Sequence, residues 1–123
     1  MDEKILLVED EAGAAQNVKM ELDGSGYELR WVRSVREARA LLPQYQPDVL
    51  LLDLTLEVDG LEFFQGLRQA GREPDAGTVL LVDDRNTALR ERAHQMGPAA
   101  VVTKPLQVGV LMAAISDLLN FRE

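Results

Sequence analysis

Short apolar segments recur along the chain, and longer segments of mixed polarity separate them. Residues 5–8, 49–52, 78–82 and 99–103 are almost uninterrupted runs of apolar side chains. Runs of this kind, without polar alternation, are typical of strands that are buried on both faces of a parallel sheet. Residues 27–32 alternate between apolar and polar side chains instead, which predicts a half-exposed strand at a sheet edge. The pattern therefore predicts five strands.

Each of these strands is followed by a segment with apolar side chains at helical spacing, which predicts five helices. The residues expected to face inward are Ala15, Val18 and Leu22; Val35, Ala38, Leu41 and Leu42; Phe63, Phe64 and Leu67; Leu89, Ala93 and Met96; and Leu111, Ala114 or Ile115, and Leu118. The fourth helix is expected over residues 87–96 and the fifth over residues 108–119. Strands and helices thus alternate along the whole chain.

Local signals define where two of the helices begin. Ser34 and Glu37 have the spacing of a capping box, so the second helix is expected to start there and to continue until Pro43. Asp59 and Glu62 form a similar pair before the third helix. Both signals place polar caps directly before apolar helical patterns.

A fivefold alternation of strand and helix indicates an α/β fold. Right-handed crossovers between parallel strands place the helices on both faces of one sheet. The chain has 123 residues, and a domain of this size buries roughly two thirds of its unfolded surface. We therefore expect residues 1–123 to form a single domain.

Composition and charge exclude several classes of function. The formal net charge of −8 disfavours direct binding to nucleic acid or to anionic lipid, both of which favour a basic face. We find no signal peptide and no apolar stretch near the roughly 20 residues that span a bilayer. The chain has no cysteine, which removes disulfides and thiolate metal sites and favours a cytoplasmic location.

Charged residues follow three of the predicted strands. Glu9 and Asp10 follow the first strand, Asp53 follows the third, and Lys104 follows the fifth. Ligands of open parallel sheets bind beyond the carboxyl ends of the strands, so these side chains are expected to share one crevice. Three carboxylates at close range repel one another unless a cation lies between them. The pattern therefore favours metal-assisted chemistry on an anion.

With these residues in these positions, the chain resembles the receiver domain of bacterial two-component response regulators. The resemblance is carried by residues 5–10, residues 49–56, the pair at 59–60 and residues 101–105. Each motif is weak by itself, but together, at the ends of the first, third and fifth strands, they are specific. The resemblance implies a flavodoxin-like, doubly wound (βα)₅ fold with strand order 2-1-3-4-5.

The resemblance also implies a role for each residue of the crevice. Asp53 would accept a phosphoryl group, and Lys104 would contact an oxygen of that group. Glu9, Asp10, Asp53 and the backbone carbonyl of Thr55 would hold Mg²⁺, which favours hard oxygen ligands. Such a domain is not a conventional enzyme, since at most it catalyses its own phosphorylation and dephosphorylation.

The partners that the resemblance implies are proteins. The phosphoryl group would come from a histidine kinase or a phosphotransfer protein, with small phosphodonors as a substitute. Residues 87–96, 99–103 and 108–119 would form the surface through which two copies pair. The family also implies a cis peptide bond between Lys104 and Pro105.

Three positions depart from the family pattern. The loop over residues 53–60 lacks the usual proline and is one residue short, which puts the position of the Thr55 carbonyl in question. Asp83 stands where a hydroxyl residue normally ends the fourth strand, and its carboxylate would repel a phosphoryl group unless Asp83 or Asp84 turns outward. Val101 replaces the usual switch aromatic. We therefore expect the acceptor and metal ligands to be kept and the switching to be atypical.

Three other classes of protein are alternatives to this interpretation. A pseudo-receiver, which never carries phosphate and acts only through protein contacts, is favoured by Asp83 and the short loop and disfavoured by the complete acidic site. A haloacid-dehalogenase-type phosphatase needs a second aspartate where Thr55 stands. A flavodoxin needs a phosphate-binding loop after the first strand, where the acidic residues 9–11 would repel the cofactor.

Overall fold

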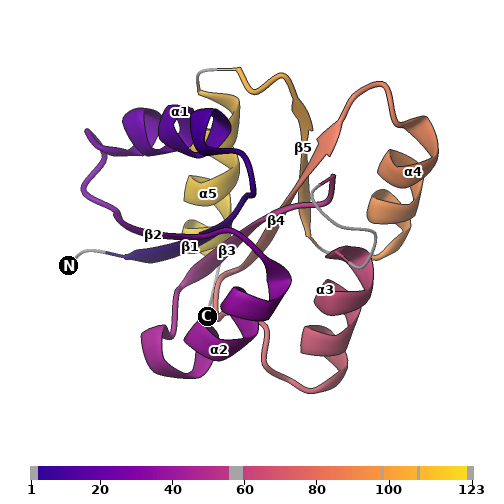
Figure 1. Cartoon of the computed structure of the whole chain (residues 1–123), viewed down its shortest axis with the longest axis horizontal. Helices are drawn as coiled ribbons and strands as arrows, with labels where there is room; N and C mark the ends of the chain where they lie inside the picture. Colours follow the sequence, from indigo (N-terminus) through magenta and orange to yellow (C-terminus); the bar gives the residue numbers. More distant parts are fainter. Residues whose placement is uncertain (1–2, 56–59, 98, 108, 122–123) are drawn as a thin grey trace.

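The computed structural model describes residues 3–55, 60–97, 99–107 and 109–121, and it forms one sheet with five helices (Figure 1). The strands are β1 (Lys4–Val8), β2 (Glu28–Val32), β3 (Val49–Asp53), β4 (Gly77–Asp83) and β5 (Ala100–Lys104). The helices are α1 (Ala12–Leu22), α2 (Val35–Tyr45), α3 (Gly60–Gln69), α4 (Thr87–Gln95) and α5 (Val110–Phe121). The elements alternate as the sequence predicts.

All neighbouring strands are parallel, and their order across the sheet is β2-β1-β3-β4-β5. This order confirms the predicted doubly wound topology. Residues 28–32 form an edge strand, in agreement with their alternating pattern. Because every strand runs in the same direction, the carboxyl ends of β1, β3, β4 and β5 lie along one edge of the sheet.

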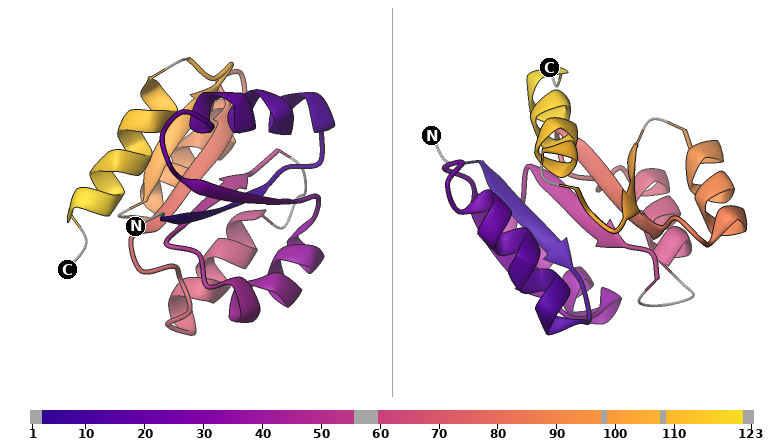
Figure 2. Two further views of the ribbon diagram at one scale, coloured as in Figure 1. Left: turned by 90° about the vertical axis from the view of Figure 1, so that its left-hand side faces the viewer. Right: turned by 90° about the horizontal axis from the view of Figure 1, so that it is seen from above.

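The continuous apolar runs are explained by a core on each face of the sheet. Ile5 and Leu7 of β1 pack with α1 and α5, whereas Leu6 and Val8 of the same strand pack with α2, α3 and α4. The strands β3 and β4 divide their side chains in the same way. The helices of the two groups lie on opposite sides of the sheet (Figures 1 and 2). Burial on both faces leaves the ends of the strands as the place for polar chemistry.

The predicted Ser34 cap before α2 forms, but the return contact of Glu37 goes to the backbone N–H one residue before the cap. The Ser34 hydroxyl accepts a hydrogen bond from the Glu37 backbone N–H at 3.1 Å, and the Glu37 carboxylate accepts one from the Arg33 N–H at 3.3 Å. The predicted second cap includes Asp59, which lies outside the described residues. The helix α4 has a side-chain cap as well, because Asn86 accepts from the Leu89 N–H at 3.1 Å.

Several predicted helix and strand boundaries are wrong by one or two residues. The helix α2 does not stop at Pro43 but continues to Tyr45, because only one backbone hydrogen bond is lost at the proline and Tyr45 gains a buried position. The last helix spans Val110–Phe121 rather than residues 108–119, with Gly109 at a φ of 93° just before it. The strand β5 spans Ala100–Lys104 rather than 99–103, and α4 ends at Gln95, with Met96 as its cap.

No helix among the described residues is both long enough and apolar enough to cross a lipid bilayer.

Candidate functional site: an acidic pocket at the carboxyl edge of the sheet

Three carboxylates meet where β1 and β3 end. Glu9 and Asp10 follow the last residue of β1, and Asp53 is the last residue of β3. One carboxylate oxygen from each residue lies within 4.8 Å of the others. Glu9 and Asp53 are buried, with about 1% of each residue exposed, whereas Asp10 is exposed. Two of the three charges are thus removed from water.

The ammonium group of Lys104, at the end of β5, joins this cluster. Its Nζ atom donates to Asp53 Oδ2 at 2.7 Å and to Glu9 Oε1 at 2.9 Å. Lys104 therefore reaches past the end of β4 and bridges the two buried carboxylates at the ends of β1 and β3. The peptide bond between Lys104 and Pro105 is cis, in agreement with the family pattern. The four residues that follow the strands in the sequence are brought to one pocket.

Thr55 completes the surroundings of Asp53. Its backbone N–H donates to Asp53 Oδ1 at 2.9 Å, and its hydroxyl donates to the same oxygen at 2.7 Å. Each carboxylate oxygen of Asp53 therefore has a donor: Thr55 on one side and Lys104 on the other. The sequence suggested only the carbonyl of Thr55 as a functional group, so the hydroxyl contact is an addition from the structure.

The protonation of the pocket reflects its burial and its close charges. Burial, together with hydrogen bonding to Asp53, raises the pKa of Glu9 to about 7, although Lys104 opposes this change. Burial acts against ionisation of Asp53 too, but hydrogen bonds with Glu9, Lys104 and Thr55 outweigh it and lower the Asp53 pKa. Burial also disfavours the charged form of Lys104, yet its two carboxylate partners raise its pKa.

The pocket fits a divalent cation. One ammonium group faces three carboxylates, so the ionised cluster has an excess of negative charge. Burial is the largest cause of the raised Glu9 pKa, and the neighbouring Asp53 adds to it. The donors are all carboxylate oxygens, the ligands that Mg²⁺ favours. The chemistry of the donor set is thus suited to Mg²⁺ held by Glu9, Asp10 and Asp53.

A contact that the sequence did not predict fixes the backbone of Glu9. The indole N–H of Trp31, on the edge strand β2, donates to the Glu9 carbonyl oxygen at 2.6 Å. The guanidinium group of Arg33 lies 5.1 Å from the centre of the Trp31 ring. The sequence predicted only a half-exposed edge strand over residues 27–32, since alternation says nothing about where an indole N–H points.

Asp83 lies at the end of β4, beside Lys104 in the register of the sheet. Its carboxylate is held by Arg85, which contacts Oδ1 through Nε at 3.1 Å and Oδ2 through Nη2 at 2.9 Å. Among the described residues, Asp83 is not a member of the group of carboxylates within 4.8 Å of one another. Asp84 is exposed, and its N–H donates to the Lys104 carbonyl at 3.2 Å. The sequence did not single out Arg85.

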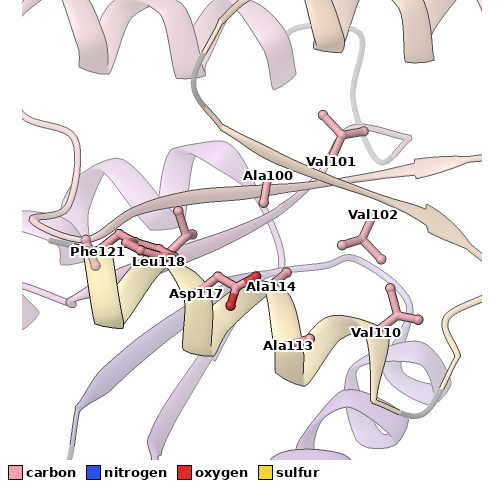
Figure 3. A pocket seen from close by; sticks show the side chains of 10 residues that line it. Ala100, Val101, Val102, Val110, Ala113, Ala114, Asp117, Leu118 and Phe121 are labelled. Carbon is pink, nitrogen blue, oxygen red and sulfur yellow. The ribbon is translucent and has the colours of Figure 1, made fainter.

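Val101, at the position of the missing switch aromatic, is half-buried in β5. It lines a hollow of about 570 Å³ between β5 and α5, which Figure 3 shows together with Val102, Val110 and Ala114. None of the residues that line this hollow belongs to the acidic pocket. The structure therefore separates an acidic site at the sheet edge from an apolar surface near α5.

The fold and the acidic pocket define the class of the protein, and the comparison with known families gives the same result. The chain belongs to the response regulator receiver domain family, whose model matches residues 5–116. Receiver domains act in two-component signal transduction, where histidine kinases phosphorylate them, and they bind Mg²⁺ in an acidic pocket.

Curated relatives include RpaA of Synechocystis, a DNA-binding dual master transcriptional regulator that is 29% identical over 118 residues. The transcriptional regulatory protein TrcR of Mycobacterium tuberculosis is 33% identical over 120 residues. Each alignment covers 95% of this chain but only 49% of RpaA and 45% of TrcR. The chain thus spans about half the length of the curated relatives it matches.

Solved structures show the same fold. The receiver domain of TorR, a response regulator of the TMAO respiratory system, superposes with a TM-score of 0.86 at 25% identity, covering 98% of this chain and 99% of that one. A response regulator from Thermotoga maritima gives a TM-score of 0.83 at 16% identity, with coverage of 98% and 99%. The latter likeness concerns the fold alone.

Proposed function

We propose that this chain is a phosphoacceptor receiver domain in which Asp53 takes a phosphoryl group from a histidine kinase or a phosphotransfer protein. The observation that carries the proposal is the convergence of Glu9, Asp10, Asp53 and Lys104 from three strands on one pocket. We take residues 1–123 as one such domain, which works in the cytoplasm and does not itself bind nucleic acid.

The reaction is a transfer between two nucleophiles. A carboxylate oxygen of Asp53 forms a bond to phosphorus while the bond from phosphorus to the donor imidazole nitrogen breaks, and that nitrogen keeps the electron pair. Lys104 is within reach of the incoming group because its Nζ lies 2.7 Å from Asp53 Oδ2. In hydrolysis, water attacks phosphorus and the Asp53 carboxylate oxygen is the leaving group.

Mg²⁺, held by Glu9, Asp10, Asp53 and the Thr55 carbonyl, would neutralise charge on the phosphoryl oxygens. Side chains of the protein orient the acceptor and supply a positive charge. The N–H and hydroxyl groups of Thr55 orient the Asp53 carboxylate through Oδ1. Lys104 holds the opposite oxygen and supplies a fixed positive charge. The acceptor is therefore oriented before the donor arrives.

Intact-mass spectrometry after incubation with acetyl phosphate and Mg²⁺ tests the proposal. The wild type is expected to gain the mass of one phosphoryl group, and the Asp53→Asn variant is expected to gain none. The exposed Asp75→Asn variant is a matched control and should behave as the wild type. A wild-type protein that takes no phosphoryl group from acetyl phosphate or from a kinase would instead indicate the pseudo-receiver.

We further propose that this domain signals in an atypical way. The strand β4 ends in Asp83 rather than in a hydroxyl residue, and β5 has Val101 in place of an aromatic side chain. Neither residue supplies the coupled movement of hydroxyl and aromatic that transmits phosphorylation in ordinary members of the family. The signal would then be transmitted, with or without phosphate, by protein contacts.

The surface for such contacts, including pairing of two copies, would be formed by α4, β5 and α5. Val110 and Phe121 of α5 are 46% and 82% exposed, and the apolar hollow beside β5 lies between them and the sheet. Hydrogen exchange with Mg²⁺ and beryllofluoride tests the atypical switching. Light scattering under the same conditions tests the pairing of two copies. Unchanged exchange in α4 and α5 is expected; a large change there would show that the ordinary switch is intact.

A further inference from the structure

The carboxylate of Asp83 accepts three hydrogen bonds from one residue of the loop that follows β4. Arg85 donates to Asp83 from its backbone N–H at 2.9 Å, from Nε at 3.1 Å and from Nη2 at 2.9 Å. These hydrogen bonds lower the pKa of Asp83, so its carboxylate stays ionised. The guanidinium group of Arg85 thus pairs with the Asp83 carboxylate and compensates its charge.

The position of this pair matters because Asp83 is the register partner of Lys104. Lys104 is the ammonium group that bridges Glu9 and Asp53. A carboxylate at the end of β4 with no cation of its own would compete for Lys104. It would also add a negative charge at the sheet edge where the anionic phosphodonor must approach.

Arg85 itself has little to pack against. Its side chain is 87% exposed, whereas that of Asp83 is 32% exposed. A side chain so exposed contributes little to the core, so the contact with Asp83 is the interaction through which Arg85 can act on the pocket. The charge of Arg85, rather than its volume, is the property that matters here.

We propose that Arg85 is a positioning residue, which holds the Asp83 carboxylate outside the acidic pocket and leaves Lys104 free to serve Asp53. The pair thereby allows a carboxylate to stand at the end of β4 without blocking phosphoryl transfer. This inference rests on the proposed function of Asp53.

The test is a double-mutant cycle that neutralises the two charges. It compares four proteins: the wild type, Arg85→Gln, Asp83→Asn and the double variant. The measured quantity is the initial rate of Mg²⁺-dependent phosphorylation by acetyl phosphate at low salt. Arg85→Gln is expected to lower the rate about tenfold, since it releases a negative charge beside the pocket. Asp83→Asn should react at least as fast as the wild type, and the double variant should match Asp83→Asn.

The cycle separates an electrostatic role from a structural one. Arg85→Lys keeps the charge and should retain most of the rate, and added salt should reduce the defect of Arg85→Gln. The proposal is overturned if Arg85→Gln reacts like the wild type. It is equally overturned if the double variant is as slow as Arg85→Gln, because Arg85 would then act independently of Asp83.

A binding measurement makes the inference independent of phosphorylation. Calorimetric titration with Mg²⁺ is expected to show severalfold tighter binding to Arg85→Gln than to the wild type, because the released carboxylate adds negative charge near the metal ligands. The double variant should return to the wild-type affinity. If the wild type takes no phosphoryl group, the proposed function fails, but these affinities still decide the role of Arg85; equal affinities overturn it.

Discussion

The charge of Lys104 compensates two carboxylates that are removed from water. We therefore expect this one side chain to have a large effect on the free energy of unfolding. Glu9 and Asp53 are each about 1% exposed, and both accept hydrogen bonds from the Lys104 ammonium group. Removal of one partner from a buried ion pair leaves an uncompensated charge, which is more costly than the loss of a surface contact.

We therefore expect Lys104→Met to lower the free energy of unfolding by about 3 kcal/mol when Mg²⁺ is absent. The measurement is urea unfolding above the Glu9 pKa of about 7, so that both carboxylates are ionised. Lys19→Met is the matched control, since the Lys19–Asp23 pair is more than half exposed and its loss should cost less than about 1 kcal/mol. Equal stability of the two variants would contradict the bridging role.

The raised pKa of Glu9 predicts that the stability of the metal-free protein depends on pH. Its pKa is raised from 4.5 to about 7 by burial and by Asp53. The folded state therefore binds the Glu9 proton more tightly than the unfolded state does, and this contribution is fully present below pH 4.5. It is lost as the pH rises from 4.5 through about 7.

The measurement for Glu9 is the free energy of unfolding across this pH range with a chelator present. The difference between wild type and Glu9→Gln should decline as the pH rises to about 7 and should then level off. Glu91→Gln, on the exposed side of α4, is the control for general charge effects. A difference that stays constant with pH would show that burial does not favour the protonated form of Glu9.

At single residues, the sequence predicts which side chains meet but not how they are held. The positions of Glu9, Asp53 and Lys104 after apolar runs are sufficient to bring them together, because parallel strands end at one edge. The contacts of Trp31 and Arg85 depend on side-chain rotamers, which leave no periodic signal in the sequence. For Asp83 the sequence left two orientations open, and only coordinates reveal its pairing with Arg85.

Among the helices, α2 depends most visibly on its first turn. The Ser34 hydroxyl caps the Glu37 N–H at 3.1 Å, and the Glu37 carboxylate returns to the Arg33 N–H at 3.3 Å. We expect Ser34→Ala to destabilise the protein by about 1 kcal/mol in urea unfolding. Ser116→Ala, within α5, removes a hydroxyl that accepts a long 3.5 Å contact from Asn120 and should cost clearly less. A reversed order would contradict the capping role.

The existence and type of each element could be predicted because both faces of the sheet are covered. Burial on both faces requires β1 and β3 to be apolar over residues 5–8 and 49–52, which distinguishes them from the amphipathic helices. Helix ends were less predictable. Pro43 indicates a break, but near a helix end the loss of one hydrogen bond is outweighed by the burial of Tyr45.

At the scale of the whole molecule, the fold separates two surfaces with different chemistry. The carboxyl edge of the sheet gathers the acidic pocket, whereas the face near α5 presents exposed apolar side chains such as Val110 and Phe121. The protein contacts that we propose would use this second surface rather than the acidic pocket. The proposed phosphoryl chemistry and the proposed protein contacts would thus have separate places in the fold.

A crystal structure with Mg²⁺ and beryllofluoride tests the central claim most directly. We expect Mg²⁺ bound by Glu9, Asp10 and Asp53, beryllium bonded to Asp53, and the Lys104 ammonium group in contact with a fluoride. We also expect the hydrogen bonds between Asp83 and Arg85 to be kept beside the pocket. Beryllofluoride at another residue, or a pocket that binds neither ion, would contradict the assignment of Asp53 as the phosphoryl acceptor.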